Sequence, residues 1–190
     1  MVRGALASLL DLEPDIEVVA QVSRGDEVVT AALASTPDVA LLDIEMPGCT
    51  GLDAADALAG KLPGCRVLIL TTFGRPGYLR RAMEGGAAGF LLKDAPAGEL
   101  AAAIRRAVSG ERVVDPGLAA AALSQGESPL TPRELEVLVA SREHATVAEL
   151  ARALYLSPGT VRNHLSSAMQ KLDARNRAEA VRIAEEKGWL

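Results

Sequence analysis

Short apolar runs alternate with helical patterns along the first 110 residues, and this alternation limits the fold more than any other feature. Strands are predicted where β-branched residues or leucines cluster, at 16–22, 39–42, 67–70 and 89–92. Helices are predicted where apolar residues recur at helical spacing, at 2–12, 26–34, 52–62, 78–84 and 96–109. Strands and helices that alternate across short loops form parallel βαβ units, so we expect an α/β domain over residues 1–110.

The pattern changes after residue 110. Residues 111–128 contain Gly, Pro, Ser and a run of alanines, and this composition is typical of a linker with one short helix. Residues 129–190 show only helical patterns. We therefore expect a second, all-α domain over residues 129–190.

Three polar residues directly end three of the predicted strands: Asp43 closes VALLD, Thr71 closes VLILT and Lys93 closes GFLLK. Parallel strands place their carboxyl ends at one edge of a sheet, where ligands bind. A carboxylate can attack phosphorus, a hydroxyl can bond a phosphoryl oxygen, and an ammonium group offsets its charge. Each residue alone is more often a helix cap or a solvated surface residue, but the three together indicate a phosphoryl site.

The segments DVALLDIEMPGCTGLD (38–53), VLILTT (67–72) and GAAGFLLKD (86–94) resemble the receiver domains of two-component response regulators. This resemblance implies a flavodoxin-like fold, with Asp43 as the phosphoacceptor and Thr71, Phe90 and Lys93 as the switch residues. It also implies a Mg²⁺ site that uses Asp43 and the backbone carbonyl of Glu45. The implied phosphoryl donor is a sensor histidine kinase.

The resemblance fails at the N-terminus, because receivers hold Mg²⁺ with an acidic pair that ends a first strand, and this chain has neither. That strand would be central, since receivers order their strands 2-1-3-4-5. Asp11 and Asp15 fall at the far end of the first predicted helix and are poor substitutes. Either Met1 is an internal methionine of a longer natural protein, which we favour, or the receiver is degenerate. Mg²⁺ binding is expected only with a complete acidic site.

The C-terminal domain predicts a helix-turn-helix. Thr131 and Glu134 have the spacing of a capping box before the first helix, and Ser157 is a candidate cap for the third helix. The second and third helices, 147–155 and 159–172, are separated by a turn short enough for this motif. The fourth predicted helix is 177–187.

The third helix has two different faces at 100° per residue. Its apolar face is predicted to be buried and consists of Val161, Leu165, Ala168 and Leu172. The opposite face has hydrogen-bonding groups and no acidic residue, which suits a major groove. It consists of Asn163, Ser166 and Gln170, with Thr160, Arg162 and Ser167 at its flanks.

The segment LTPRELEVL…TVAELARALYLSPGTVRNHLSSAMQKL resembles the LuxR/NarL-type DNA-binding domain of the NarL/FixJ response regulators, across residues 130–190. This resemblance implies base contacts by Arg162, Asn163 and Ser166. The implied phosphate contacts are Thr160, Lys171 and Arg177. Two surfaces are expected to contact a second copy of the chain. The first and last receiver helices supply one of them; in the last of these helices Leu100, Ala103, Ile104 and Ala107 lie on one stripe, part of which must pack on the sheet. The other comprises Ala178, Val181 and Ala184 in the last helix of the chain.

Charge is distributed unevenly along the chain. The formal net charge is −5, but residues 152–182 hold six basic and two acidic side chains, which suits DNA binding. Cys49 and Cys65 have neither the spacing of a zinc site nor that of a disulfide framework, so reduced thiols are expected. No apolar run is long enough to span a bilayer, and no signal peptide is recognisable, so we expect a cytoplasmic protein without membrane contact.

These features predict a transcriptional regulator of a two-component phosphorelay that is not an enzyme. Phosphorylation of Asp43 would favour a homodimer that binds promoter DNA. One alternative is a phosphorylation-independent DNA-binding regulator with a degenerate receiver. A small hydrolase or phosphatase is a further alternative, but it would need a second catalytic group near Asp43, and the sequence offers none.

Overall fold

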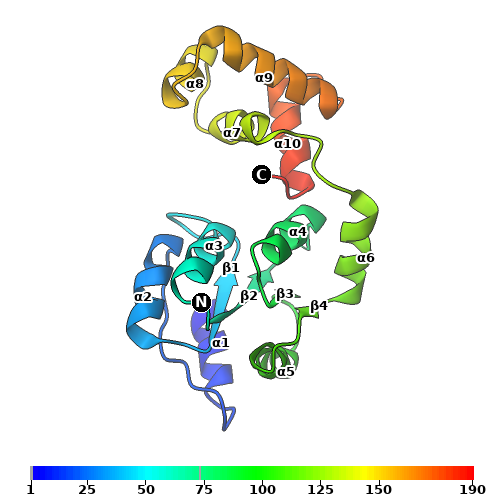
Figure 1. Ribbon diagram of the computed structural model, residues 1–190. Coiled ribbons are helices and arrows are strands. Elements are labelled where there is room, and N and C mark those ends of the chain that lie inside the picture. Colours follow the sequence, from blue (N-terminus) through cyan, green and yellow to red (C-terminus); the bar gives the residue numbers. More distant parts are fainter. Residues whose placement is uncertain (1, 73) are drawn as a thin grey trace. The chain divides into compact units, whose positions relative to one another are not determined.

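The computed structural model describes residues 2–72 and 74–190, which form two compact units (Figure 1). The N-terminal unit runs from the first helix to Ala121, except that Arg75–Tyr78 group with the other unit. The C-terminal unit contains residues 122–190. No helix of the described residues is both long and apolar enough to cross a membrane.

The N-terminal unit is built on a parallel sheet with the strand order β1-β2-β3-β4. Its strands are β1 (Val39–Asp43), β2 (Arg66–Thr71), β3 (Gly89–Leu92) and β4 (Val113–Val114). The helices in this part of the chain are α1 (Val2–Leu10), the short 3-10 helix η1 (Gly25–Glu27), α2 (Val28–Ser35), α3 (Gly51–Lys61), α4 (Pro76–Glu84), α5 (Ala97–Val108) and α6 (Pro116–Gln125). The predicted α/β fold is therefore confirmed, and β4 is a strand that the sequence did not predict.

The predicted strand at 16–22 is wrong, because this segment is extended but belongs to no strand. Among the described residues β1 pairs only with β2, so β1 is an edge strand of the sheet. The segment meets other partners: the Val18 amide donates to Asp11 Oδ1 at 3.1 Å, and Arg3 Nη1 donates to the Val22 carbonyl at 2.7 Å. A strand needs a neighbour to pair its backbone groups, and the described residues provide none beside this segment.

Helices α1 and α5 share a core with the sheet. Leu10 of α1 and Leu68 and Leu70 of β2 pack in it with the inward side of α5. That inward side includes Leu100, Ala103, Ile104 and Ala107, which are all buried. The prediction that these four residues contact a second copy is therefore wrong, because they face the sheet.

The C-terminal unit consists of four helices, and each begins at a side chain that caps it. The helices are α7 (Pro132–Ala140), α8 (Val147–Ala153), α9 (Pro158–Lys171) and α10 (Arg177–Glu186). Their caps are Thr131, Thr146, Ser157 and Asn176, and each accepts a hydrogen bond from the backbone two or three residues into its helix. The predicted capping box of Thr131 and Glu134 is confirmed.

The core of the C-terminal unit contains the predicted apolar face of α9, which is confirmed. Val161, Leu165, Ala168 and Leu172 are buried with residues of the other three helices. Ala184 of α10 is also fully buried in this core. The predicted contact of Ala184 with a second copy is therefore wrong. Ala178 is exposed and Val181 is half-buried, so the contact of these two residues stays a prediction.

Glu134 is a buried carboxylate, 3% exposed, that joins α7 to α9. It accepts hydrogen bonds from the Thr131 amide at 2.7 Å, from Ser167 Oγ at 2.6 Å and from Lys171 Nζ at 2.8 Å. Burial by itself raises the pKa of Glu134, but the bonds from Lys171, Ser167 and Thr131 outweigh it and lower that pKa to about 2.

We expect Glu134→Gln to destabilise the C-terminal unit by about 3 kcal/mol, because the charge that is bonded to Lys171 is lost. The free energy of unfolding is measured in urea by the fluorescence of Trp189, the single tryptophan, which packs against the core of this unit. Glu136→Gln is the matched control, since Glu136 lies on the same helix in an exposed pair with Arg133. That variant is expected to change stability by less than about 1 kcal/mol.

The pH dependence of the same measurement checks the cause. The pKa of Glu134 is lowered by folding, so its stabilising contribution is present above about pH 4.5 and is lost as the pH falls toward about 2. The difference between the wild-type protein and Glu134→Gln should shrink over this range. A difference that stays constant down to pH 2 would show that charge is not the cause.

Candidate functional site

The carboxyl ends of β1, β2 and β3 bring the three predicted polar residues to one edge of the sheet. Asp43 ends β1 opposite Leu70 of β2, and Thr71 ends β2 opposite Leu92 of β3. Lys93 follows β3 directly, and its amide donates to the Thr71 carbonyl at 2.8 Å. The site is therefore assembled by strand register.

Asp43 and Lys93 are in direct contact. Lys93 Nζ lies 2.5 Å from Asp43 Oδ2, and the side chains are 21% and 33% exposed respectively. The Glu45 amide donates to the other carboxylate oxygen at 3.3 Å. One third of the Asp43 side chain is accessible, so an incoming phosphorus atom can reach the carboxylate.

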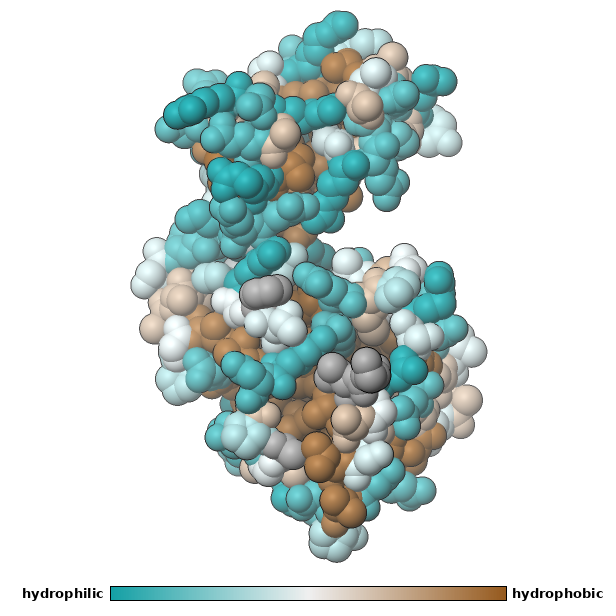
Figure 2. Space-filling view, turned by 180° about the vertical axis from the view of Figure 1, so that it is seen from behind, coloured by the Kyte–Doolittle hydropathy of each residue, from teal (hydrophilic) through white to brown (hydrophobic). Residues whose placement is uncertain are grey.

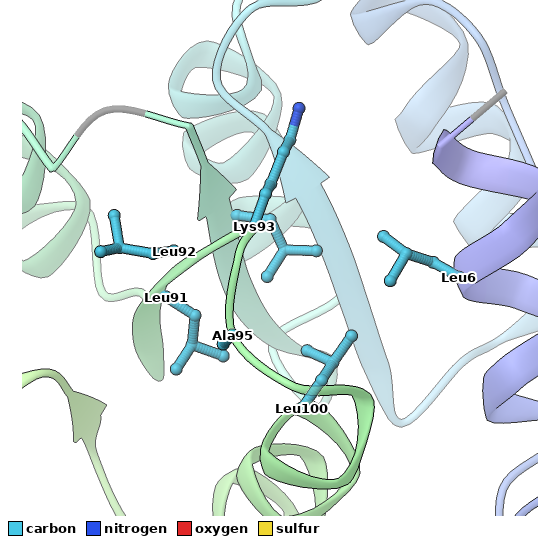
Figure 3. Close-up of a pocket in the computed structure, with 7 residues that line it drawn as sticks. Leu6, Leu91, Leu92, Lys93, Ala95 and Leu100 are labelled. Atoms are coloured by element: carbon cyan, nitrogen blue, oxygen red, sulfur yellow. The ribbon is translucent and has the colours of Figure 1, made fainter.

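An apolar pocket lies beside this ion pair. Figure 3 shows Lys93 at its rim, with Leu6 of α1, Leu91 of β3 and Leu100 of α5 around it. The remaining lining residues are Leu70, Leu92 and Ala95. The Lys93 side chain extends away from these leucines, so its ammonium group lies outside the apolar pocket (Figure 3).

The two proposed switch residues are buried. Thr71 is 4% exposed at the end of β2, and Phe90 is fully buried within β3. Thr71 lies beside the residue that bonds Asp43, because Lys93 is anchored to its carbonyl.

The described residues do not supply the Mg²⁺ site of a receiver. They contain no group of three or more His, Cys, Asp or Glu side chains that could hold a metal ion. Asp15 is bonded to Arg105, and Asp11 accepts a bond from the Val18 amide. Mg²⁺ prefers six oxygen ligands, and Asp43 with the Glu45 carbonyl provides two candidate ligand groups.

The outer face of α9 presents three of the predicted DNA contacts. Arg162, Asn163 and Ser166 are exposed, and within residues 2–72 and 74–190 their side chains make no hydrogen bond or ion pair. Residues 150–172 contain Arg152, Arg162 and Lys171 but no acidic residue. This face is therefore positive and has its hydrogen-bonding groups available.

The other three predicted DNA contacts already have partners within the unit. Thr160 Oγ1 lies 2.8 Å from the Ser157 hydroxyl, Lys171 is paired with Glu134, and Arg177 Nη1 donates to the His144 carbonyl at 3.2 Å. Lys171 keeps about one third of its side chain exposed and has three donors, so it can bond a phosphate without leaving Glu134.

The role of Glu134 in holding α9 could not be predicted from the sequence. The capping box identified Glu134 as a partner of the Thr131 backbone, but Ser167 and Lys171 lie more than thirty residues away. No local signal links these positions.

The two cysteines are free, as predicted, and burial raises the pKa of the Cys65 thiol.

Two family models match the chain. The first, described as the response regulator receiver domain, matches residues 1–105. The second, described as bacterial regulatory proteins of the luxR family, matches residues 128–184. Their order along the chain is the order of the two structural units.

Curated relatives align over nearly their whole length. The transcriptional regulatory protein DesR of Bacillus subtilis is 47% identical over 190 residues, which cover 100% of this chain and 94% of DesR. The response regulator RamR of Streptomyces coelicolor is 42% identical over 193 residues, which cover 100% of this chain and 93% of RamR.

Solved structures agree in fold. The response regulator ChrA of a heme-sensing two-component system has a TM-score of 0.56 at 36% identity, with 100% of this chain and 93% of ChrA covered. RcsB of Salmonella enterica serovar Typhimurium has a TM-score of 0.69 at 22% identity, with 97% of this chain and 93% of RcsB covered. These matches and the geometry of both units lead to one conclusion: the chain belongs to the two-component response regulators, DNA-binding transcriptional regulators that join a receiver domain to a LuxR-type helix-turn-helix domain.

Proposed function

We propose that Asp43 is the phosphoacceptor through which a sensor histidine kinase controls this regulator. The observation that carries the proposal is the ion pair of Asp43 and Lys93 at the carboxyl ends of β1 and β3, the two strands that flank β2. A carboxylate oxygen of Asp43 attacks the phosphorus of a phosphohistidine, forming an acyl phosphate. The phosphorus–nitrogen bond breaks, and the leaving imidazole takes up a proton.

Lys93 and Thr71 respond to the new charge in this proposal. The Lys93 ammonium transfers its bond from the carboxylate to a phosphoryl oxygen, and the Thr71 hydroxyl moves to bond another. Phe90 follows because it lies in β3, the strand that Lys93 directly follows. The movement passes from β3 to α5, whose outward side then favours a homodimer. A regulator with these two partners works in the cytoplasm, and the proposal gives it no enzymatic reaction of its own.

A second candidate is a regulator that binds DNA without phosphorylation. The observation that favours this candidate is that the described residues supply no acidic pair beside Asp43 to complete a Mg²⁺ site. The two candidates differ in whether Asp43 can be phosphorylated once such a pair is provided.

We expect a protein extended at its N-terminus by a strand ending in two aspartates to be phosphorylated at Asp43 by acetyl phosphate with Mg²⁺. The 190-residue chain alone should take up little or no phosphate. Asp43→Asn in the extended protein should abolish uptake, because an amide is a poor nucleophile. Intact-mass spectrometry measures the added phosphoryl group.

The matched control for this experiment is Asp53→Asn, which removes an exposed carboxylate of α3 and should leave uptake unchanged. Phosphate retained by Asp43→Asn would place the acceptor elsewhere. An extended protein that takes up no phosphate but binds DNA would favour the second candidate.

The outward sides of α1 and α5 are the proposed dimer surface of the N-terminal unit. Hydrophobic side chains reach the surface of this unit (Figure 2). Leu9 of α1 is 46% exposed and Val108 of α5 is 54% exposed, and these two helices pack against each other. Burial of such side chains between two copies would stabilise a dimer.

We expect Leu9→Asp or Val108→Asp to weaken dimerisation of the phosphorylated extended protein by at least roughly tenfold, because a charge would be buried without a partner. Sedimentation velocity measures the monomer–dimer equilibrium. Leu33→Asp is the control, since Leu33 of α2 is 49% exposed on a different helix. A dimer that tolerates both changes must use another face.

Helix α9 is the proposed reading helix. Arg162 and Asn163 lie in its first half, the part of a recognition helix that contacts bases, and Ser166 follows on the same face. The proposed phosphate contacts are Thr160 and Lys171, at the two ends of α9, and Arg177, at the start of α10. The absence of acidic residues from 150–172 supports this assignment, because phosphates repel carboxylates.

We expect Arg162→Ala and Asn163→Ala each to cost roughly 1–3 kcal/mol on a duplex selected by the wild-type protein from a random pool, and to relax the preference at one base pair. Lys171→Ala should weaken selected and scrambled duplexes alike and lower the salt slope by about one unit. Fluorescence anisotropy at several salt concentrations gives both quantities. If both α9 variants keep the wild-type base preference, another element reads the DNA.

A further inference from the structure

Tyr155 occupies an unusual place in the turn between α8 and α9. It is 96% exposed, and its φ is +54°, in the left-handed region. The Leu156 amide bonds the Ala151 carbonyl at 2.8 Å, and the Tyr155 amide bonds the Arg152 carbonyl at 3.3 Å. These two bonds form the Schellman motif that ends α8, with Tyr155 at the position where glycine is favoured.

The fold of the unit does not account for a tyrosine at this position. A side chain with a β-carbon disfavours the left-handed conformation, and a bulky one is rare there. The Tyr155 side chain makes no hydrogen bond or ion pair with any residue of 2–72 or 74–190. The equivalent position after α9 is Asp173, with φ +51°, which is one of the residue types that tolerate this conformation.

The surroundings of Tyr155 favour an anionic partner. The turn directly precedes Ser157, the cap of α9, so Tyr155 lies beside the end of the helix that would enter the groove (Figure 1). Arg152 is exposed one turn earlier in α8, and no acidic residue occurs from 150 to 172. A tyrosine hydroxyl can donate to a phosphate oxygen, and tyrosine is among the side chains that contact the DNA backbone.

We infer that Tyr155 is a DNA-backbone contact, with its hydroxyl donating to a phosphodiester oxygen of the strand that borders the groove entered by α9. This inference rests on the proposal that α9 is the reading helix. It differs from the cationic phosphate contacts in one respect: tyrosine is neutral, so its contact releases no counterion.

The experiment measures the binding of the full chain to the selected and scrambled duplexes at several salt concentrations. Tyr155→Phe removes only the hydroxyl and should weaken both duplexes on the order of tenfold. The salt slope should stay at its wild-type value, because no phosphate-bound cation is lost. Tyr155→Gly should weaken binding at least as much, while the urea midpoint reported by Trp189 stays equal or rises, because glycine suits the left-handed conformation.

The matched control is Thr36→Gly, which relieves a left-handed residue (φ +45°) in the N-terminal unit and should leave DNA binding unchanged. If Tyr155→Phe and Tyr155→Gly both bind each duplex within twofold of wild type, the inference is overturned. If Tyr155→Gly loses DNA binding but Tyr155→Phe binds like wild type, the proposed bond from the hydroxyl to a phosphate is overturned.

The outcomes for α9 are separate. If Arg162→Ala and Asn163→Ala keep the base preference while Tyr155→Phe weakens both duplexes, the reading helix is wrong and the Tyr155 contact stands. If the α9 variants behave as proposed and the Tyr155 variants bind like wild type, only the Tyr155 contact fails. If neither the wild-type chain nor the phosphorylated extended protein binds either duplex, both proposals are overturned.

Discussion

Parallel pairing of β1, β2 and β3 is the constraint on which the phosphoryl site depends. Asp43, Thr71 and Lys93 are far apart in sequence, and each gains its place by being the residue that ends or follows a strand. Successive side chains of a strand point to opposite faces of the sheet, so a register slip of one residue in β1 would turn Asp43 away from Lys93. The chemistry at this edge is thus set by backbone hydrogen bonds between apolar strands.

The C-terminal unit positions its functional helix in a different way. The buried face of α9 fixes which side chains point outward, and the bonds from Ser167 and Lys171 to Glu134 fix its rotation against α7. A buried carboxylate is costly unless it is fully bonded, and Glu134 has partners on both helices. The direction in which the polar face of α9 points is consequently fixed by two contacts. The apolar side of α9 packs in the core, and the carboxylate of Glu134 bonds side chains near the C-terminal end of α9.

Sequence reasoning succeeded where the signal was local. The strand-ending residues Asp43, Thr71 and Lys93 could be read from apolar runs, and the buried face of α9 from helical spacing. It failed at 16–22, because a β-branched run becomes a strand only when a neighbour pairs with it. It also misjudged the inward side of α5, including Ile104, because helical spacing shows that a stripe is apolar but not which partner covers it. The bonds of Glu134 join distant positions and leave no local pattern.

The four side-chain caps of the C-terminal unit have a consequence for how the chain reaches its fold. Thr131, Thr146, Ser157 and Asn176 define the starts of α7 to α10 from contacts within three residues, so the start of each helix is set by local contacts. The sheet of the N-terminal unit must instead close long loops before any strand is paired, as when Val39 meets Arg66. Since local contacts form faster than distant ones, we expect the C-terminal unit to fold earlier in refolding experiments, although it is made last by the ribosome.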